Sequence, residues 1–537
     1  MKLIIRYLKE AICSYPKLFG KVFVLAFINT LVQAIIPLAI KKFLDALSLQ
    51  ADQWFFLCVG IASYSVILLF VNLIDVLWYR ALDDFGGNYI LQLTLTLESQ
   101  LAFTYGAEVD QVGRDKIYNI IYNDVLDAFR VIGHHSAALI SSLAIVITAI
   151  LITAFHNIVV AVLLSLGFLI GLLIANKTRE IMKKASETIN SKMKSHSAIC
   201  RDFSSQMDRV QSNNILGYYQ AKTTEAIQDF IQTAKALDNK QVFYSNLLRH
   251  INSIFSLALF AFITINPQNT LIDLVFIMSI SNIVIGNISK IDQLYFQILS
   301  SYGAFRQIDQ LRKLPLKTGQ KGLSRIESVE FINVCFGYGD RAEYLLDNIN
   351  FKFERGDCIK VIAPNGAGKS TMFKLLQGVY KPLSGDVKFN NQSLEVYDPT
   401  AVNQEIVYVG QNDGYITDSI LNYFRVFTGK DISQEADPEA LEIIEELDLH
   451  KTIQSEGNNI SFGQRKRIQL ATLFLRMESA SVLILDEVDA GLDAAGTCLY
   501  KQKINEIIDK KEKIIFFVQH GSHTNINYNK TLAIGVQ

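Results

Sequence analysis

The sequence has little of what marks disulfide-rich, metal-binding or nucleic-acid-binding proteins. Its 6 cysteines are scattered over 537 residues without a C-x-x-C pair, so we expect structural thiols rather than a disulfide framework or a zinc site. The formal net charge of −1 excludes a strongly basic surface for nucleic acid. No short apolar run with a small-residue cleavage site follows the N-terminus. We therefore interpret the first apolar run as an anchor rather than a signal peptide.

Apolar residues are abundant and unevenly distributed. They make up 50% of the chain against 19% charged residues, and the mean hydropathy is +0.23. A helix needs about 20 mostly apolar residues to cross a membrane. Six stretches in the first three hundred residues reach that length: Phe19–Ile40, Trp54–Leu77, Ala137–Phe155, Ile158–Ala175, Leu247–Ile265 and Leu271–Ile288. They predict an α-helical transmembrane domain with six spans.

Basic residues indicate how these spans are oriented. They gather before the first span and after the fourth, at Lys2, Arg6, Lys9, Lys17, Lys21, Lys177, Arg179, Lys183 and Lys184. The bias places the N-terminus in the cytoplasm, although Lys41 and Lys42 run against it. The two long connections, Tyr79–Ser136 and Asn176–Asn246, are then cytoplasmic, and their helical pattern predicts long stalks. The chain is thus predicted to be a multi-pass protein of the inner (plasma) membrane.

The second half contains a glycine-rich turn between a predicted strand and a predicted helix. A polar, basic segment interrupted by Pro315 serves as the linker, and strands are predicted at Ser328–Phe336, Ile349–Phe353 and Cys358–Ile362. The turn that follows is a P-loop in which Ala363 replaces the first glycine. Such a loop directs backbone N–H groups at phosphate oxygens, while its lysine meets the β and γ phosphates and its hydroxyl binds Mg²⁺. The predicted nucleotide-binding residues here are Asn365, Gly366, Ala367, Gly368, Lys369, Ser370 and Thr371.

An apolar strand that ends in two acids provides the second part of this site. Ser481–Leu485 delivers Asp486 to the carboxyl end of a buried strand, where a carboxylate can orient Mg²⁺. Glu487 follows, placed to polarise an attacking water. The metal ligands predicted from these two motifs are Ser370 and Asp486. Together the two motifs predict binding and hydrolysis of a nucleoside triphosphate.

Ile460-Ser461-Phe462-Gly463-Gln464 lies between these motifs and resembles the L-S-G-G-Q signature of ATP-binding cassette (ABC) ATPases. Six spans and one cassette on a chain look like a half-transporter of the exporter type, also called type IV. The resemblance implies that Tyr338 stacks on adenine and that Gln411 is the Q-loop residue and a further Mg²⁺ ligand. It implies further that Asp493 belongs to the D-loop and that His520 contacts the γ-phosphate. It also implies that Ser461, Gly463 and Gln464 bind nucleotide held by another cassette. Glu487 and His520 are the expected catalytic residues.

Three departures from the family pattern fall close to these residues. Ala363 tolerates positive φ less well than glycine, so the entry to the P-loop is expected to differ slightly. Phe462 replaces a glycine of the signature, and Val488 stands where the family commonly has proline. None of them removes a catalytic group.

The resemblance implies an architecture and a working unit. The expected domains are a transmembrane domain over 1–312, a linker over 313–327 and an α/β P-loop cassette domain over 328–537, the last in the cytoplasm. ATP and Mg²⁺ are the expected cofactors, and each site needs a second half-transporter chain, as a homodimer with two competent sites or as a heterodimer. The stalk tips around Asp110–Lys116 and Asn213–Tyr219 are expected to be the coupling segments that contact cassettes.

The substrate is the least determined part. The chain resembles bacterial exporters of ribosomal peptides and bacteriocins, so a peptide or another amphipathic molecule is expected, with membrane lipid around the spans and no nucleic acid. No peptidase segment precedes the spans, so leader cleavage is not expected. A multidrug or lipid exporter, an importer on the same fold and a non-transporting ATPase regulator remain alternatives. The polar residues that could line a cavity are Asn29, Gln33, Asn72, Asp75, Asn282 and Asn287, although Asp75 is expected at the membrane interface.

Overall fold

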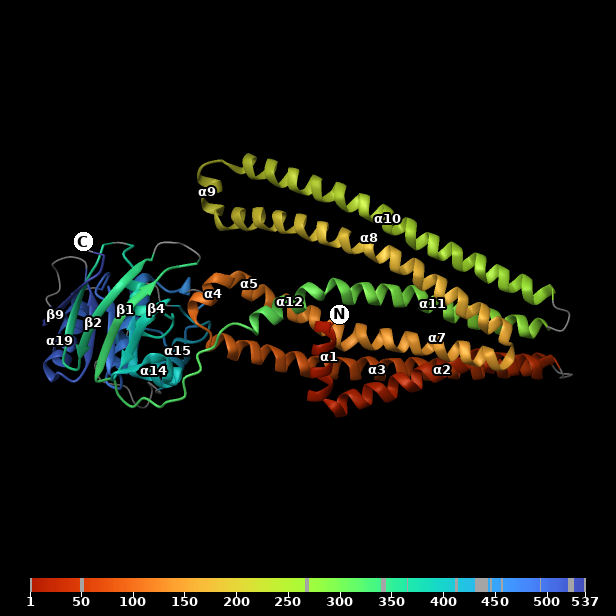
Figure 1. The fold of residues 1–537 in the computed structure, drawn as a ribbon, viewed down its shortest axis with the longest axis horizontal. Coiled ribbons are helices and arrows are strands. Elements are labelled where there is room, and N and C mark those ends of the chain that lie inside the picture. Colours follow the sequence, from red (N-terminus) through yellow and green to blue (C-terminus); the bar gives the residue numbers. More distant parts are fainter. Residues whose placement is uncertain are drawn as a thin grey trace. The chain divides into compact units, whose positions relative to one another are not determined.

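A computed structural model of the chain divides into two compact units (Figure 1). It describes residues 2–537 except 49–52, 266–269, 340–343, 365, 411–413, 430–442, 445–446, 455–456, 493, 520–525 and 536–537. Many side chains between 174 and 195 and between 237 and 271 also lie outside the description. Unit 1 comprises Met1–Leu97 and Ile117–Arg312, and unit 2 comprises Glu98–Lys116 and Lys313–Gln537. The second unit therefore takes in a stretch of the first long connection, which the sequence analysis assigned wholly to the transmembrane domain.

Unit 1 is built from helices. They are α1 (Lys2–Ser14), α2 (Pro16–Ser48), α3 (Gln53–Ala102), α5 (Arg114–Asn119), α6 (Val125–Phe129), α7 (Ser136–His156), α8 (Ile158–Ser205), α9 (Met207–Ser212), α10 (Leu216–Ile265), α11 (Leu271–Ser300) and α12 (Tyr302–Leu311), with π-helical turns at Ile120–Asp124 and Arg130–His135. The end of α3 and the start of α5 pass into unit 2. Helix α7 packs against α2, α8 and α11, and its buried Val146 and Ala149 share an apolar core with Ile280 of α11.

Each predicted span falls inside a helix, but the count of six is not confirmed. Within the described residues, four helical stretches are long and apolar enough to cross a membrane: Pro16–Leu47, Leu57–Ala102, Arg114–His156 and Ile272–Leu311. The predicted fourth span corresponds to a shorter apolar stretch, Ile158–Leu173. Most side chains of the predicted fifth span, Leu247–Ile265, lie outside the described part. The described residues thus support a membrane protein without fixing six crossings.

Local sequence explains where these helices begin and end. Pro16 opens α2, where its missing N–H costs nothing. A single residue, Asn157, separates α7 from α8, and its side chain accepts hydrogen bonds from the backbone N–H groups of Val159 and Val160. This cap lets α8 begin directly after α7. Thr270 and Asp273 form a capping box at the start of α11.

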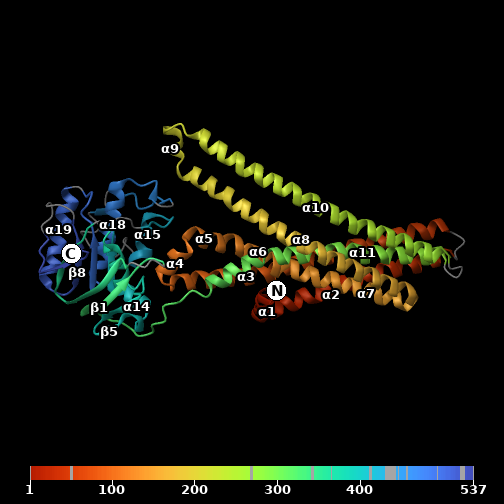
Figure 2. The same cartoon turned by 45° about the horizontal axis from the view of Figure 1, so that its top comes forward.

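The second long connection forms a helical hairpin. Helices α8 and α10 run side by side and are joined at one end through α9 (Figures 1 and 2). The helix is interrupted between Ser212 and Leu216, where Asn214 has a φ of 51°. Tyr219 donates a hydrogen bond of 2.9 Å to Asp202 across the hairpin. The interruption therefore falls within Asn213–Tyr219, one of the two expected coupling segments.

Unit 2 contains two sheets and the helices around them. Its strands are β1 (Ser328–Phe336), β2 (Leu346–Glu354), β3 (Cys358–Ile362), β4 (Ser384–Phe389), β5 (Gln392–Ser393), β6 (Ile406–Val409), β7 (Val482–Asp486), β8 (Ile514–Val518) and β9 (Lys530–Ala533). Its helices are α4 (Gly106–Val112), α13 (Lys369–Leu376), α14 (Pro399–Glu405), α15 (Ile420–Thr428), α18 (Phe462–Met477) and α19 (Ala494–Lys510), with a 3₁₀ turn at Leu394–Val396. The predicted strands at Ser328–Phe336 and Cys358–Ile362 are confirmed to the residue, and Ile349–Phe353 lies within β2.

The larger sheet is parallel and places several strand ends at one edge. Its order is β6-β7-β8-β3-β9, and every neighbouring pair in it is parallel. The smaller sheet, β2-β1-β4-β5, is antiparallel. Strands β7 and β8 are buried at every position, in agreement with their unbroken apolar sequences. Ligand sites in parallel sheets form outside the carboxyl ends of the strands, which is where the predicted motifs follow β3 and β7.

Candidate functional site

The predicted P-loop connects β3 to α13 in a conformation that only its glycines allow. Gly366 and Gly368 have φ values of 82° and 95°, and a Cβ on Gly368 would lie 2.8 Å from Cδ2 of Leu346. Ala363 is not among the residues with positive φ, so the strain expected at the loop entry does not arise. The Lys369 Nζ donates a hydrogen bond of 2.9 Å to the Ala363 carbonyl and so lies across the loop. Such a loop closed by an ammonium group suits a phosphate.

The other residues of the predicted P-loop lie at the start of α13. Lys369 and Ser370 form the first turn of the helix, whose N–H groups and dipole favour an anion. Ser370 is exposed, as is Gly366, while Thr371 is buried. Ala367 lies between the two glycines, and a Cβ on Gly535 would come within 3.1 Å of its Cβ. Exposed hydroxyl and backbone groups at this point can meet a nucleotide from solvent.

The two predicted acids follow the buried strand β7. Asp486 is only 8% exposed, and Tyr408 of the neighbouring strand donates a hydrogen bond of 3.4 Å to its Oδ2. Glu487 has a φ of 57°, a left-handed conformation that is uncommon for a residue other than glycine. A strained backbone of this kind costs about 1–3 kcal/mol and is often found where a side chain must be aimed.

The order of strands in the parallel sheet brings these two motifs to the same edge. β7 and β3 flank β8, so Asp486 and the P-loop follow carboxyl ends that are separated by a single strand. A hydroxyl at Ser370 and a carboxylate at Asp486 are oxygen ligands of the kind that Mg²⁺ binds. The residues present therefore fit a Mg²⁺-nucleotide, with the glycine cradle beside them.

Tyr338, the predicted adenine-stacking residue, lies just after β1 and contacts the P-loop helix. Its hydroxyl shares a hydrogen bond of 2.8 Å with Oγ1 of Thr371. Its ring packs edge-on against Phe336 and Tyr380, at centroid distances of 5.3 and 5.9 Å. The side chain remains 41% exposed. The contacts with Phe336 and Tyr380 and the hydrogen bond to Thr371 hold the Tyr338 ring in place. The exposed part of the ring can stack on a base.

The predicted signature begins α18 and is exposed. Ser461 caps the helix: its hydroxyl accepts from the Gln464 N–H, and the Gln464 side chain accepts from the Ser461 N–H. Ser461, Phe462 and Gly463 are all exposed. The Phe462 ring lies against Gly491. A Cβ atom added to Gly491 would be 2.3 Å from Cε1 of Phe462. The ring therefore packs on the turn that follows Glu487.

Four predicted residues lie outside the described part of the chain. They are Asn365, Gln411, Asp493 and His520. The strands expected to carry two of them are described, since β6 ends at Val409 and β8 ends at Val518. Their roles stay predictions.

The ABC transporter family profile matches residues 346–490, which contain the P-loop, the signature and both acids. The chain contains an ABC transporter domain. An ABC transporter ATP-binding protein of Clostridium perfringens is 32% identical over 210 residues, which cover 37% of this chain and 35% of that protein. The sublancin-168-processing and transport ATP-binding protein SunT of Bacillus subtilis is 22% identical over 491 residues, 87% of this chain and 68% of SunT. The chain thus spans about a third of the first relative's length.

A solved structure extends the likeness to the whole chain. It is a bacterial Atm1-family ABC exporter with ATP bound, with a TM-score of 0.83, and the match covers 97% of this chain and 93% of the other at 17% identity. At that identity the likeness concerns the fold. The chain has the exporter-type ABC fold, which is the fold that the motifs implied.

Within unit 2, α4 is bound to the ABC domain by Tyr380, a residue that belongs to none of the predicted motifs. The Tyr380 hydroxyl donates a hydrogen bond of 2.6 Å to Asp110 of α4 and accepts one of 2.9 Å from Lys374 of the P-loop helix. The Gly106 N–H donates to the Val379 carbonyl at 2.7 Å. Burial and the Asp110 carboxylate raise the pKa of Tyr380. Asp110 belongs to the segment predicted to contact a cassette, but its partner is an ordinary tyrosine outside every motif.

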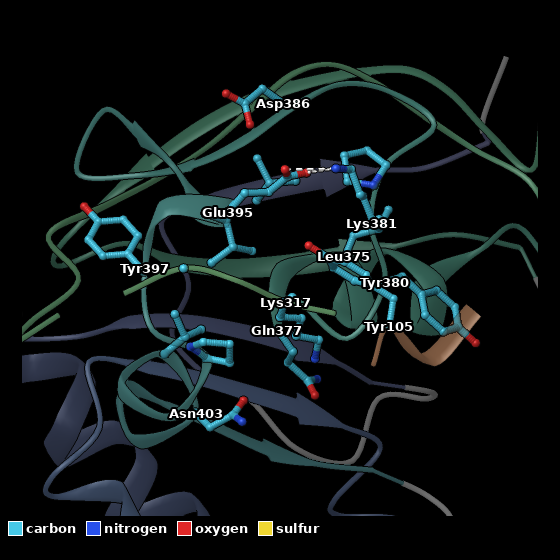
Figure 3. Close-up of a pocket in the computed structure, with 17 residues that line it drawn as sticks. Tyr105, Lys317, Leu375, Gln377, Tyr380, Lys381, Asp386, Glu395, Tyr397 and Asn403 are labelled. Carbon is cyan, nitrogen blue, oxygen red and sulfur yellow. Dashed lines mark hydrogen bonds and ion pairs between the residues drawn. The ribbon is translucent and has the colours of Figure 1, made fainter. Parts of the chain in front are cut away.

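A small cavity opens beside this contact (Figure 3). Its volume is about 40 Å³, and Tyr105, Lys317 and Tyr380 contribute to its wall together with Lys381 and Glu395, which form an ion pair. Burial lowers the pKa of Lys317. The P-loop residues that meet phosphate do not line it. A space of this size holds a few waters rather than a nucleotide, so the nucleotide site remains at the edge of the parallel sheet.

Proposed function

We propose that this chain is one half of an ATP-driven membrane exporter that works as a dimer and moves a peptide or another amphipathic molecule. The observation that carries the proposal is the pairing of a glycine-dependent P-loop with Asp486 and Glu487 at one edge of a parallel sheet. The exporter-type fold of the chain supports it.

Each residue of the site receives a role in this proposal. Lys369 pairs with the β and γ phosphates in place of the Ala363 carbonyl, and Tyr338 stacks on adenine. Glu487 polarises the attacking water. Ser370, Asp486 and Gln411 would hold Mg²⁺, which when bound neutralises charge on the phosphates. His520 and Asp493 complete the site as the family resemblance implies.

The dimer follows from the position of the signature. Ser461 and Gly463 are exposed at the start of α18, where a phosphate can meet the positive end of the helix dipole. In the proposed dimer they meet ATP that is held by the P-loop of a second chain. ATP drives the membrane part only through its higher affinity for the closed pair of cassettes. We further propose that the cassette lies in the cytoplasm, because basic residues precede the first span.

The substrate class rests on two supports of different kinds. SunT is named for processing and transport of sublancin-168, and its match extends over 87% of this chain. The half-transporter body resembles bacteriocin exporters. Measuring the direction of flux separates export of a peptide from the alternatives: a labelled peptide accumulates in inside-out vesicles with ATP if the chain exports it. Uptake in right-side-out vesicles would indicate an importer, and ATP hydrolysis without flux would indicate a regulator.

Two variants test the ATP site itself. Lys369→Ala should abolish ATP binding while the chain still inserts into membranes, because the ammonium meets phosphate and the spans do not depend on it. Glu487→Gln should retain binding and slow turnover by about 10²–10⁴-fold, since it keeps the shape but loses the basic oxygen. Lys510→Ala, an exposed lysine at the end of α19, is the matched control. ATP affinity of Lys369→Ala within about twofold of wild type would contradict the site.

A further inference from the structure

Three polar side chains form a hydrogen-bonded group between two apolar helices of unit 1. The Asn29 Nδ2 on α2 donates to Oδ1 of Asp75 on α3 at 2.6 Å. The Gln33 Nε2 donates to Oδ1 of Asn29 at 2.9 Å. Asn29 is only 2% exposed, and Asp75 is partly buried. Gln33 thus holds the Asn29 amide with its N–H groups toward the carboxylate.

Charged pairs on the same helices show how deep this group lies. Lys21 of α2 and Asp84 of α3 are exposed and 3.9 Å apart, and Lys41 at the other end of α2 pairs with Asp273 of α11 at 2.7 Å. Twenty residues separate Lys21 from Lys41, or about 30 Å at 1.5 Å per residue, which is the thickness of a hydrocarbon core. Asn29 lies about 12 Å inside the Lys21 level. Through its hydrogen bond to Asn29, Asp75 lies at the same level.

A carboxylate at that depth requires a partner. Among the described residues, its hydrogen-bond partner is the Asn29 amide, and none of the ion pairs found there includes Asp75. An ionised group in hydrocarbon is costly unless it is paired, and intramembrane carboxylates commonly mark paths for substrates or ions. One amide donor reduces that cost but supplies no positive charge. A bound molecule that carries a positive group can supply that charge.

We propose that Asp75, with Asn29 and Gln33, binds a cationic group of the transported molecule, a primary ammonium or a guanidinium. This inference rests on the proposed function and adds a substrate class to it. The carboxylate pairs with the cation, while Asn29 fixes the carboxylate from the other side. The apolar surfaces of α2 and α3 around the group suit the rest of an amphipathic molecule. Basic amphipathic peptides and amphipathic amines have this chemistry.

Binding of two matched peptides to the full chain tests the inference. The probes are an acetylated, amidated Leu-Leu-Lys-Leu-Leu peptide with a neutral fluorophore and its norleucine counterpart, which has nearly the same bulk without the charge. The chain is placed in phosphatidylcholine nanodiscs, which carry no net charge to attract the lysine peptide. The dissociation constants are measured by fluorescence anisotropy without nucleotide. We expect the lysine peptide to bind at least about tenfold more tightly, a difference typical of a partly buried charge pair.

Variants assign that preference to the carboxylate. Asp75→Asn should remove the difference between the peptides, and Asp75→Glu should restore part of it. Ser65→Ala, an exposed position ten residues earlier on α3, should keep the full preference. Equal affinities on the wild-type chain would overturn the inference. A preference that survives in Asp75→Asn would also overturn it.

The outcome is separate from that of the ATP site. If Lys369→Ala leaves ATP binding intact but the lysine preference depends on Asp75, the proposed transport function falls and the cation site remains. If ATP binding depends on Lys369 and the peptides bind alike, the transporter remains and the cation site falls.

Discussion

At the scale of single residues, the turn after β7 holds two left-handed conformations close together. Glu487 has a φ of 57° and Gly491 a φ of 83°. The Phe462 ring lies against Gly491 and 5.9 Å from Nζ of Lys466. An aromatic residue of the signature thus packs on the turn that begins with the proposed base, and a side chain at position 491 would displace it.

This packing predicts non-additive effects of two substitutions. In a chain that keeps Phe462, Gly491→Ala should lower ATP turnover more than tenfold. The new methyl group collides with the Phe462 ring, and an alanine in the left-handed conformation costs about 1–2 kcal/mol. In a chain that also carries Phe462→Ala the collision is absent, so Gly491→Ala should lower ATP turnover clearly less. The turnover of wild type, both single variants and the double variant gives the coupling. Additive effects would mean that the ring and the turn are energetically independent.

At the scale of elements, α4 is bound to the ABC domain by Tyr380. Tyr380→Phe should leave Asp110 and Lys374 without their shared hydroxyl, a loss of about 1.5–3 kcal/mol for hydrogen bonds to charged groups. We expect faster amide hydrogen exchange in Gly106–Val112. Tyr397→Phe is the matched control, because it removes a 3.2 Å hydrogen bond to the Phe389 carbonyl elsewhere in the same unit. Equal exchange of α4 in both variants would rule out this link.

The elements also show how far the sequence alone could predict the molecule. Strands β1 and β3 were predictable to the residue because their apolar runs end at turn residues. The P-loop was predictable because glycine is the residue that adopts the positive φ values of Gly366 and Gly368 most easily. The contact of Asp110 with Tyr380 could not be predicted, since the two residues are 270 positions apart and no local pattern pairs them. The hydrogen bond of Asp75 to Asn29 could not be predicted either, because it depends on the register of α3 against α2.

At the scale of the whole molecule, the proposed dimer predicts an ATP-dependent crosslink. In Glu487→Gln, cysteines placed beside Ser370 and beside Gly463 should crosslink between two chains in ATP and not without it, since slow hydrolysis lets the closed pair accumulate. The exposed Cys13, Cys58, Cys200 and Cys498 must first be replaced. Cys335 and Cys358 are buried, and burial raises the pKa of Cys358 to about 12, so that thiol can stay. Crosslinking that is independent of nucleotide would argue against ATP-driven closure.

The discontinuity of unit 2 has a consequence for biosynthesis. Glu98–Lys116 leaves the ribosome long before Lys313–Gln537, yet both belong to one compact unit. While α7 to α11 are being synthesised, Tyr380 and Val379 do not yet exist, so Asp110 and Gly106 cannot form their hydrogen bonds with them. At about 5–20 residues per second, some 270 residues take roughly 13–55 seconds. Throughout that interval α4 lacks its hydrogen bonds to Tyr380 and Val379, and we expect it to be open to chaperones and proteases.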